Sequence, residues 1–251
     1  MTPSSRRTLL LLGVLLLSGV LCSGCNKPNR TDRIYEDPYP LPRTLAVAPF
    51  LNQSGSDYLD VLAVTDEFYT ELQQVKNLDV VAVNKVLATM SRMGIMKISN
   101  PDDAVRLVDA LGIDGVIVGS ITQYDPYRPP KMGMAVQLYT TGKDSDKKLP
   151  AQHINPGKLA RAAKPFALEA GKALLPRVGV VRIFDADHND VIDRLKQYAA
   201  DRAGNDRPSG WETYLTSRRY LRFVSYEVIG EMLALERDWL DQKQISSVDG
   251  E

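Results

Sequence analysis

The apolar run at residues 111–124 constrains the fold more than any other stretch, because the rest of the chain is organised around it. It opens with Gly and Asp, continues through Val116, Ile117 and Val118, and ends on polar residues. A short β-branched run between turn residues predicts a strand that is buried on both faces. Residues 44–50 have the same character. We therefore predict that these two strands lie side by side at the centre of one sheet.

The segments around these strands alternate between helical and extended patterns. Apolar residues recur at helical spacing after each of the first strands, and two later segments, 131–140 and 178–184, read as strands. The longest helical pattern spans residues 211–240 and carries a dense aromatic set, which favours core packing over a partner surface. We expect an α/β (α+β-like) fold with a mixed central sheet of about five strands, flanked by helices and followed by a long C-terminal helix.

The first 24 residues form an export signal. Arg6 and Arg7 precede an apolar core that is shorter than the roughly 20 residues of a membrane-spanning helix. The following segment, Leu21-Cys-Ser-Gly-Cys25, resembles the lipobox of bacterial lipoproteins, although Cys22 stands where that pattern usually has an aliphatic residue. The resemblance implies that residues 1–24 are removed and that acyl chains on Cys25, a palmitate among them, anchor the protein to a membrane. The alternative is an ordinary secretory signal, with Cys25 present by chance.

The residue after the acylated cysteine sorts lipoproteins between membranes, and here it is Asn26 rather than Asp. By that resemblance we expect the outer membrane, with the protein facing the periplasm, and the inner membrane stays open. Residues 25–42 contain four prolines and no apolar period, which predicts an extended tether. We expect one domain over residues 43–240 and a disordered tail over residues 241–251.

The segment at residues 141–177 interrupts the domain pattern. It is rich in Gly, Pro, Ala and Lys, and its cations outnumber its acids. We interpret it as a mobile basic insertion. It is either a solvated linker or a contact arm for an anionic partner, and the arm would use Lys147, Lys148, Lys158, Arg161 and Lys164.

Three motifs carry a resemblance to a known kind of domain. They are AVAPF-x-N-x-S-G at residues 46–55, DVV at residues 79–81, and I-D-G-V-I-V-G-S-I-x-x-Y at residues 113–124. Residues 44–139 resemble the periplasmic α/β domain of penicillin-binding-protein activator lipoproteins, the curli secretion lipoprotein and the N-terminal domain of TolB. Because those are binding and assembly proteins, the resemblance implies an interaction module. The short tether departs from such activators, and the long hairpins of the curli-type pore are not apparent.

The motifs of catalysis and metal binding are absent from the sequence. It has no Gly-x-Ser-x-Gly, no phosphate-binding glycine loop and no His-rich zinc pattern. Residues 185–190 begin like a calcium loop, but Asp190 and Lys196 replace its glycine and its glutamate, so Asp187 is better explained as a helix N-cap. We expect no enzyme activity and no cofactor or metal. A formal net charge of zero also argues against nucleic-acid binding.

The sequence therefore predicts a membrane-anchored periplasmic lipoprotein. We expect a non-catalytic protein-interaction module in cell-envelope assembly or in the regulation of a cell-wall synthase, with an envelope protein as its partner. The alternative is a structural subunit of an outer-membrane or trans-envelope secretion complex, in which the chain associates with itself. A third, weaker possibility is an envelope hydrolase with an unrecognised site.

Overall fold

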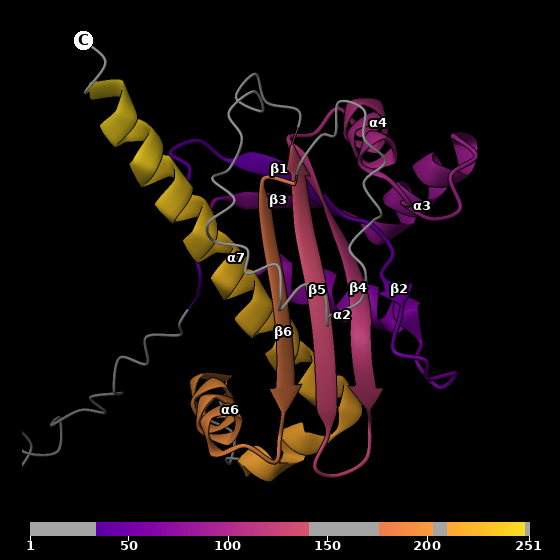
Figure 1. The fold of residues 1–251 in the computed structure, drawn as a ribbon, viewed down its shortest axis with the longest axis vertical. Coiled ribbons are helices and arrows are strands. Elements are labelled where there is room, and N and C mark those ends of the chain that lie inside the picture. The colour runs from indigo at the N-terminus through magenta and orange to yellow at the C-terminus, as the bar shows by residue number, and fades with distance from the viewer. Residues whose placement is uncertain (1–33, 141–175, 203–209, 249–251) are drawn as a thin grey trace, which may run out of the picture. The chain divides into compact units, whose positions relative to one another are not determined.

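The computed structural model describes residues 34–140, 176–202 and 210–248, with side chains placed as far as Gln242. A mixed sheet has the strand order β3-β1-β4-β5-β6, and the short β2 pairs with β4 (Figure 1). The first three strands of this order run parallel, and β5 and β6 are antiparallel to their neighbours. The strands are β1 (Arg43–Val47), β2 (Leu51–Asn52), β3 (Leu78–Val81), β4 (Gly115–Asp125), β5 (Lys131–Thr140) and β6 (Val178–Asp185).

The two apolar runs do lie side by side, as predicted. Val47 of β1 is the partner of Ile117 in β4, and both side chains are fully buried. Pro49 follows β1 and has no amide hydrogen, so it cannot continue the ladder. The chain resumes pairing two residues later, where Leu51 of β2 pairs with Ser120. The first extended segment is therefore two strands, both against β4.

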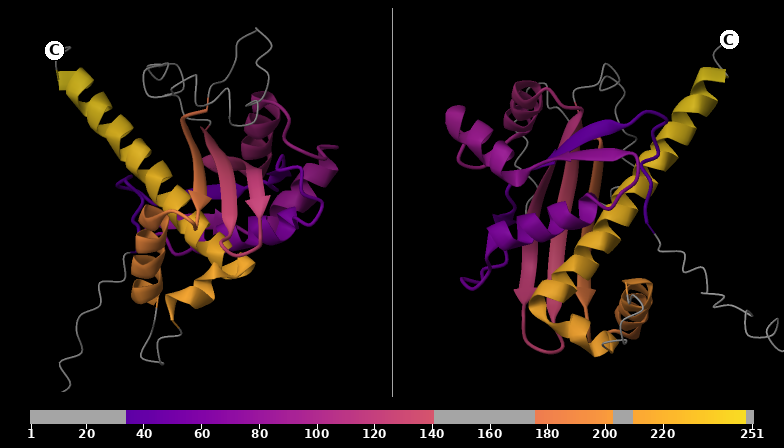
Figure 2. Two further views of the ribbon diagram at one scale, coloured as in Figure 1. Left: turned by 60° about the horizontal axis from the view of Figure 1, so that its bottom comes forward. Right: turned by 180° about the vertical axis from the view of Figure 1, so that it is seen from behind.

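Helices cover the two faces of the sheet differently (Figures 1 and 2). The long α7 (Ser217–Val248) and α2 (Val61–Leu72) pack on one face and share the larger core. On the other face, α3 (Val83–Arg92) and α4 (Pro101–Leu111) cover the end of the sheet formed by β3, β1 and β4. The predicted fold class is confirmed, including the mixed sheet and the long C-terminal helix.

The C-terminal segment differs from the single helix that the spacing predicts. Its start is the 3₁₀ helix η1 (Trp211–Leu215), and α7 begins only at Ser217. Thr216 between them is extended, with φ −85° and ψ 143°, so the helical register breaks there. Tyr220 and Phe223 are buried, as core packing requires. α6 (Asn189–Arg202) lies beside η1 near the start of α7 (Figure 1).

The later part of the expected tether packs on the domain. Residues 35–42, here called the strap, include buried Asp37 and form a parallel β-bridge between Glu36 and Lys76. Proline content alone predicts extended chain, but it does not reveal these contacts. Tether residues 25–33 and the basic insertion up to residue 175 lie outside the described residues. In the described ranges no helix is both long and apolar enough to cross a bilayer.

Candidate functional site

The strap is fixed to the domain by backbone and ring contacts. The Lys76 N–H donates to the carbonyl of Tyr35 at 2.9 Å, and the Asp37 N–H donates to the carbonyl of Lys76 at 3.0 Å. Asn77 Nδ2 donates to the carbonyl of Tyr39 at 2.8 Å. The Tyr35 ring stacks on Tyr226 of α7, with 4.6 Å between the ring centroids. The strap therefore bridges the segment before β3 and the long helix.

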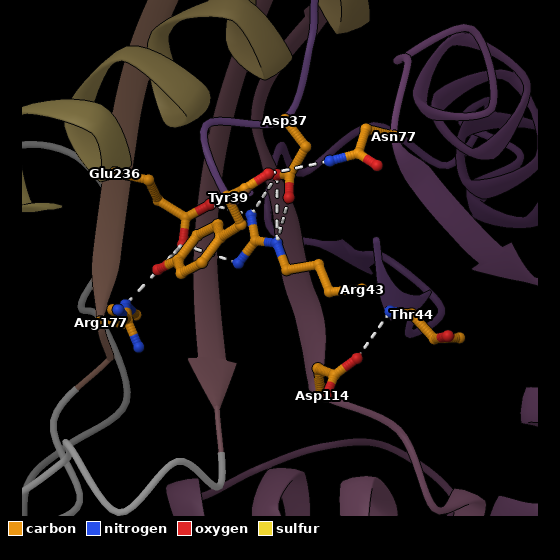
Figure 3. Close-up of polar contacts among 8 residues, drawn as sticks. All are labelled: Asp37, Tyr39, Arg43, Thr44, Asn77, Asp114, Arg177 and Glu236. Carbon is orange, nitrogen blue, oxygen red and sulfur yellow. Dashed lines mark hydrogen bonds and ion pairs between the residues drawn. The ribbon is translucent and has the colours of Figure 1, made fainter. Parts of the chain in front are cut away.

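A buried ion network, here called the latch, joins the strap to α7 through Arg43 (Figure 3). The Arg43 guanidinium donates to both Asp37 oxygens, with Nε–Oδ2 at 2.9 Å and Nη2–Oδ1 at 2.7 Å. It also donates to both oxygens of Glu236, with Nη1–Oε1 at 2.9 Å. Glu236 is fully buried and Asp37 is 4% exposed. Such planar, two-pronged pairs are the strongest charge-assisted hydrogen bonds.

Aromatic rings enclose the latch. The Arg43 guanidinium lies 4.2 Å from the centroid of the Tyr39 ring. Arg177, just before β6, lies 3.7 Å from the centroid of Trp239, and its Nε is 3.8 Å from Glu236 Oε1. Guanidinium groups are attracted to the faces of aromatic rings, and more strongly where water is excluded. The latch thus joins the strap, β1, the segment before β6 and α7.

Burial and charge shift the pKa values of the latch in opposite directions. Burial raises the pKa of Asp37, although the guanidinium of Arg43 counteracts this shift. Burial lowers the pKa of Arg43, but its hydrogen bonds to Glu236 and Asp37 outweigh burial and raise it, so Arg43 is cationic at any accessible pH. Burial and then the nearby Glu236 carboxylate raise the pKa of Tyr39 to about 12. Near neutral pH, Arg43 is therefore charged and the Tyr39 hydroxyl is uncharged.

A second set of buried acids lies on α2. Glu67 receives hydrogen bonds from Arg218 and Arg222 of α7. One helical turn later, Glu71 accepts from Arg202 Nη2 at 2.7 Å and from the Tyr198 hydroxyl at 3.2 Å. Both glutamates are nearly inaccessible to solvent. These pairs fasten α2 to α7 and α6.

The lipidation site and the basic arm that the sequence predicts both fall outside the described part of the chain. Cys25, Lys147, Lys148, Lys158, Arg161 and Lys164 all lie outside the described residues. Asp114, which the sequence places at a strand entrance, accepts from the Thr44 N–H at 2.7 Å and so links β4 to β1. The His188 side chain is 68% exposed.

The stretch that begins like a calcium loop has other roles. The Asp185 carboxylate contacts Lys131 Nζ at 2.8 Å and accepts from the Asp187 N–H at 3.0 Å. α6 begins at Asn189, so the residue before the helix is His188, and the prediction that Asp187 is its N-cap is wrong. Within the described residues, no group of three or more His, Cys, Asp or Glu side chains is placed to hold a metal.

Sequence reasoning missed the latch because Asp37 was assigned to the tether and Arg43 to the start of a strand. One signal was available. Glu236 lies seven residues after Ile229 and four after Met232, so helical spacing puts it on the buried stripe of α7. A carboxylate on such a stripe requires a buried cation as partner. Arg43, at the start of an apolar strand, is the residue that meets this need.

Comparison with known proteins gives a fold-level likeness. No family model matches this chain, and no curated protein matches it. Among solved structures, the LpoB C-terminal domain from Salmonella enterica is 16% identical, with 41% of this chain and 76% of that chain covered and a TM-score of 0.35. The lipoprotein GNA1162 from Neisseria meningitidis is 14% identical, with 66% and 99% covered and a TM-score of 0.38.

A third neighbour is the PelC dodecamer from Paraburkholderia phytofirmans, 9% identical, with 77% of this chain and 86% of that chain covered and a TM-score of 0.31. The LpoB domain is of the activator-lipoprotein kind that the strand motifs resemble. At such TM-scores the likeness says nothing about activity.

Proposed function

We propose that this chain is a lipid-anchored protein of the bacterial envelope that acts as a non-catalytic protein-interaction module. Its task is cell-envelope assembly or the regulation of a cell-wall synthase. The strap is the observation that carries this proposal. Tyr35 is fixed on the domain ten positions after Cys25, and an extended chain of that length reaches at most about 35 Å. A lipid on Cys25 would therefore hold the domain within about one domain diameter of the membrane.

The use of buried charge supports a binding role. Within the described ranges, the buried charged residues are Asp37, Arg43, Glu67, Glu71 and Glu236, and each is paired with an opposite charge that joins two elements. Such pairs fix the positions of elements, and a buried carboxylate whose oxygens are held by arginine is poorly placed to accept a proton from a substrate.

Cross-linking inside cells, followed by mass spectrometry, tests the proposal. The native chain is compared with a Cys25→Ala variant. We expect cross-links to an envelope protein such as a peptidoglycan synthase in the native chain and their loss in the variant. Cross-links that are the same in both would show that anchoring plays no part. Incorporation of labelled palmitate at Cys25 tests lipidation separately, and membrane fractionation tests the outer-membrane location.

An alternative is a structural subunit of an outer-membrane or trans-envelope complex. The edge strand of the sheet supports this alternative. β6 is the last strand in the described sheet, and Ile183 on it is 58% exposed. An uncovered edge strand is a template for pairing with another chain. Analytical ultracentrifugation decides between the two: a defined oligomer favours the subunit, and a monomer at micromolar concentration favours the interaction module.

The basic segment is a separate part of the proposal. Lys147, Lys148, Lys158, Arg161 and Lys164 would form an arm that contacts an anionic surface. Replacing all five with glutamine should weaken binding to vesicles that contain phosphatidylglycerol. Unchanged vesicle binding would leave this segment as a linker.

A further inference from the structure

A pair of arginines at the start of α7 is held in place by one acid. Arg218 and Arg222 each donate Nε to Glu67, one to each carboxylate oxygen. The Glu67 side chain is 3% exposed, whereas those of Arg218 and Arg222 are 80% and 41% exposed. Because Nε is the inner nitrogen of the guanidinium, this pairing leaves the outer Nη groups for another partner. Among the described residues, none accepts a hydrogen bond from those Nη groups.

The position of these cations is unfavourable for the helix itself. Arg218, Arg219 and Arg222 lie within the first six residues of α7, where the helix dipole is positive and repels cations. Among the described residues, Glu67 is the only carboxylate paired with any of the three. Arg219 donates from Nη1 to the Thr213 hydroxyl at 2.8 Å and lies 5.7 Å from the centroid of Tyr214. Arg218 and Arg222 fasten α7 to α2 through Glu67, but among the described residues Arg219 has no ion pair that would offset its position.

The basic surface extends onto α6. Arg202 pairs with Glu71 and is 34% exposed at its side chain. Four guanidinium groups therefore share two buried carboxylates, and the surface keeps an excess of two positive charges. α2, α6 and α7, which carry these residues, lie on the same face of the sheet (Figure 2).

We propose that this surface, here called the arginine clamp (Arg202, Arg218, Arg219 and Arg222), binds a carboxylate-rich segment of a partner protein. Guanidinium groups match planar carboxylates with two parallel hydrogen bonds, and groups already held by Glu67 lose little freedom on binding. In one respect the inference rests on the proposed function, because a protein partner is assumed.

The clamp extends from the start of α7 toward the strap. Arg218 precedes Glu236 of the latch by 18 residues, which is about 27 Å along a helix. The strap, which leads toward Cys25, is fixed at the latch.

The first residue of the strap, Tyr35, packs on Tyr226 and Gly230 of α7, and the Arg202 guanidinium lies 5.5 Å from the Tyr226 ring centroid. Arg218 precedes Gly230 by 12 residues, about 18 Å along a helix, so this end of the clamp would stay within reach of a periplasmic protein in an anchored domain.

The test uses the full chain with Cys25→Ala, so that no lipid contributes, and a fluorescein-labelled decaglutamate peptide as the probe. Fluorescence anisotropy at low and high salt should show binding that weakens with salt. R219Q leaves both hydrogen bonds to Glu67 intact and should weaken binding about threefold, while R218Q/R222Q should weaken it about tenfold. R218K/R222K keeps the charges beside Glu67 but loses the planar guanidinium groups. Its affinity for the peptide should lie between those of the native chain and R218Q/R222Q.

The matched control is R106Q, which removes one charge from an exposed arginine of α4 on the other face of the sheet. It should bind the peptide as the native chain does. Equal binding by R219Q, R218K/R222K and the native chain would overturn the clamp. A second outcome would also overturn it: the chain binds phosphatidylglycerol vesicles more tightly than the peptide, and the same substitutions abolish the vesicle binding. The surface would then bind lipid. Neither readout depends on lipidation, so the clamp and the anchor can fail separately.

Discussion

Gly230 of α7 lies directly beneath the ring of Tyr35. A β-carbon built on this glycine would be 2.2 Å from both Cζ and Oη of the tyrosine. Glycine is a poor helix former, so its place in the middle of a long helix needs a reason. The close approach of the strap supplies one: the missing side chain leaves a slot into which the tyrosine fits.

Gly230→Ala should therefore release the start of the strap, at Tyr35, while the latch still holds Asp37 and the domain stays folded. The new methyl group displaces Tyr35, at the cost of its stacking on Tyr226, while alanine favours the helix by about 1 kcal/mol. We expect a small change in melting temperature and much faster proteolysis at residues 35–39. In a Tyr35→Ala background the same substitution should only stabilise the domain. Unchanged protection of the strap in Gly230→Ala would contradict this packing.

Glu236→Gln tests the latch. Arg43 would remain buried with Asp37 alone, and losing one partner of a buried ion network costs about 2–4 kcal/mol of unfolding free energy. Urea denaturation measures the loss. Glu231→Gln on the same helix is the control, because its pair with Arg182 is partly exposed and should contribute less than about 1 kcal/mol. Similar losses for the two variants would show that the latch adds no special stability.

Stability should depend on pH through Glu67. Burial alone would raise the pKa of Glu67, but Arg222 and Arg218 outweigh burial and lower it below the usual 4.5. An acid whose pKa is lower in the folded state stabilises the fold above its unfolded pKa and loses this contribution as pH falls through the folded value. The unfolding free energy should therefore decline below about pH 4.5, and less steeply in Glu67→Gln. Asp66→Asn, a neighbouring exposed acid, should follow the native profile.

Deleting residues 141–176 should leave the domain folded. Val178 of β6 is the partner of Leu138 in β5, and the Arg177 N–H donates to the Leu138 carbonyl at 2.8 Å, so the two strands are already antiparallel neighbours. A two-residue Asn-Gly turn can join such strands. We expect a cooperative thermal transition within a few degrees of the native one. A broad transition, or one at a much lower temperature, would show that the deleted residues belong to the core.

Hydrophobic periodicity and the placement of glycines predict the sheet and most helices, because the sheet and the helices depend on burial over many residues. The ends of helices depend on single side chains and are less predictable. Asp57 and Asn84 are plausible N-caps by residue type, yet α2 is capped by Asp60 and α3 follows Ala82 without a side-chain cap. Asn100 does cap α4, where the following proline restricts the alternatives.

The latch and the arginine clamp were less accessible to sequence reasoning, because both depend on long-range pairing. Arg43 and Glu236 are 193 residues apart, and Glu67 and Arg222 are 155 apart. Local patterns identify charged residues on buried helical stripes, such as Glu236, but they do not identify the partner. The order of the strands and the crossing of α7 over the sheet decide which charges meet.

The latch also has a consequence for the order in which the protein folds. Its hydrogen bond from Arg43 to Glu236 closes a loop of nearly the whole domain, and loops of this length close late because of the chain entropy they remove. The residues needed to close it are among the first and the last of the domain to be synthesised. A chain that stops before residue 236 would hold Arg43 with half of its counter-charge. Completion of the polypeptide is thus built into the final folding step.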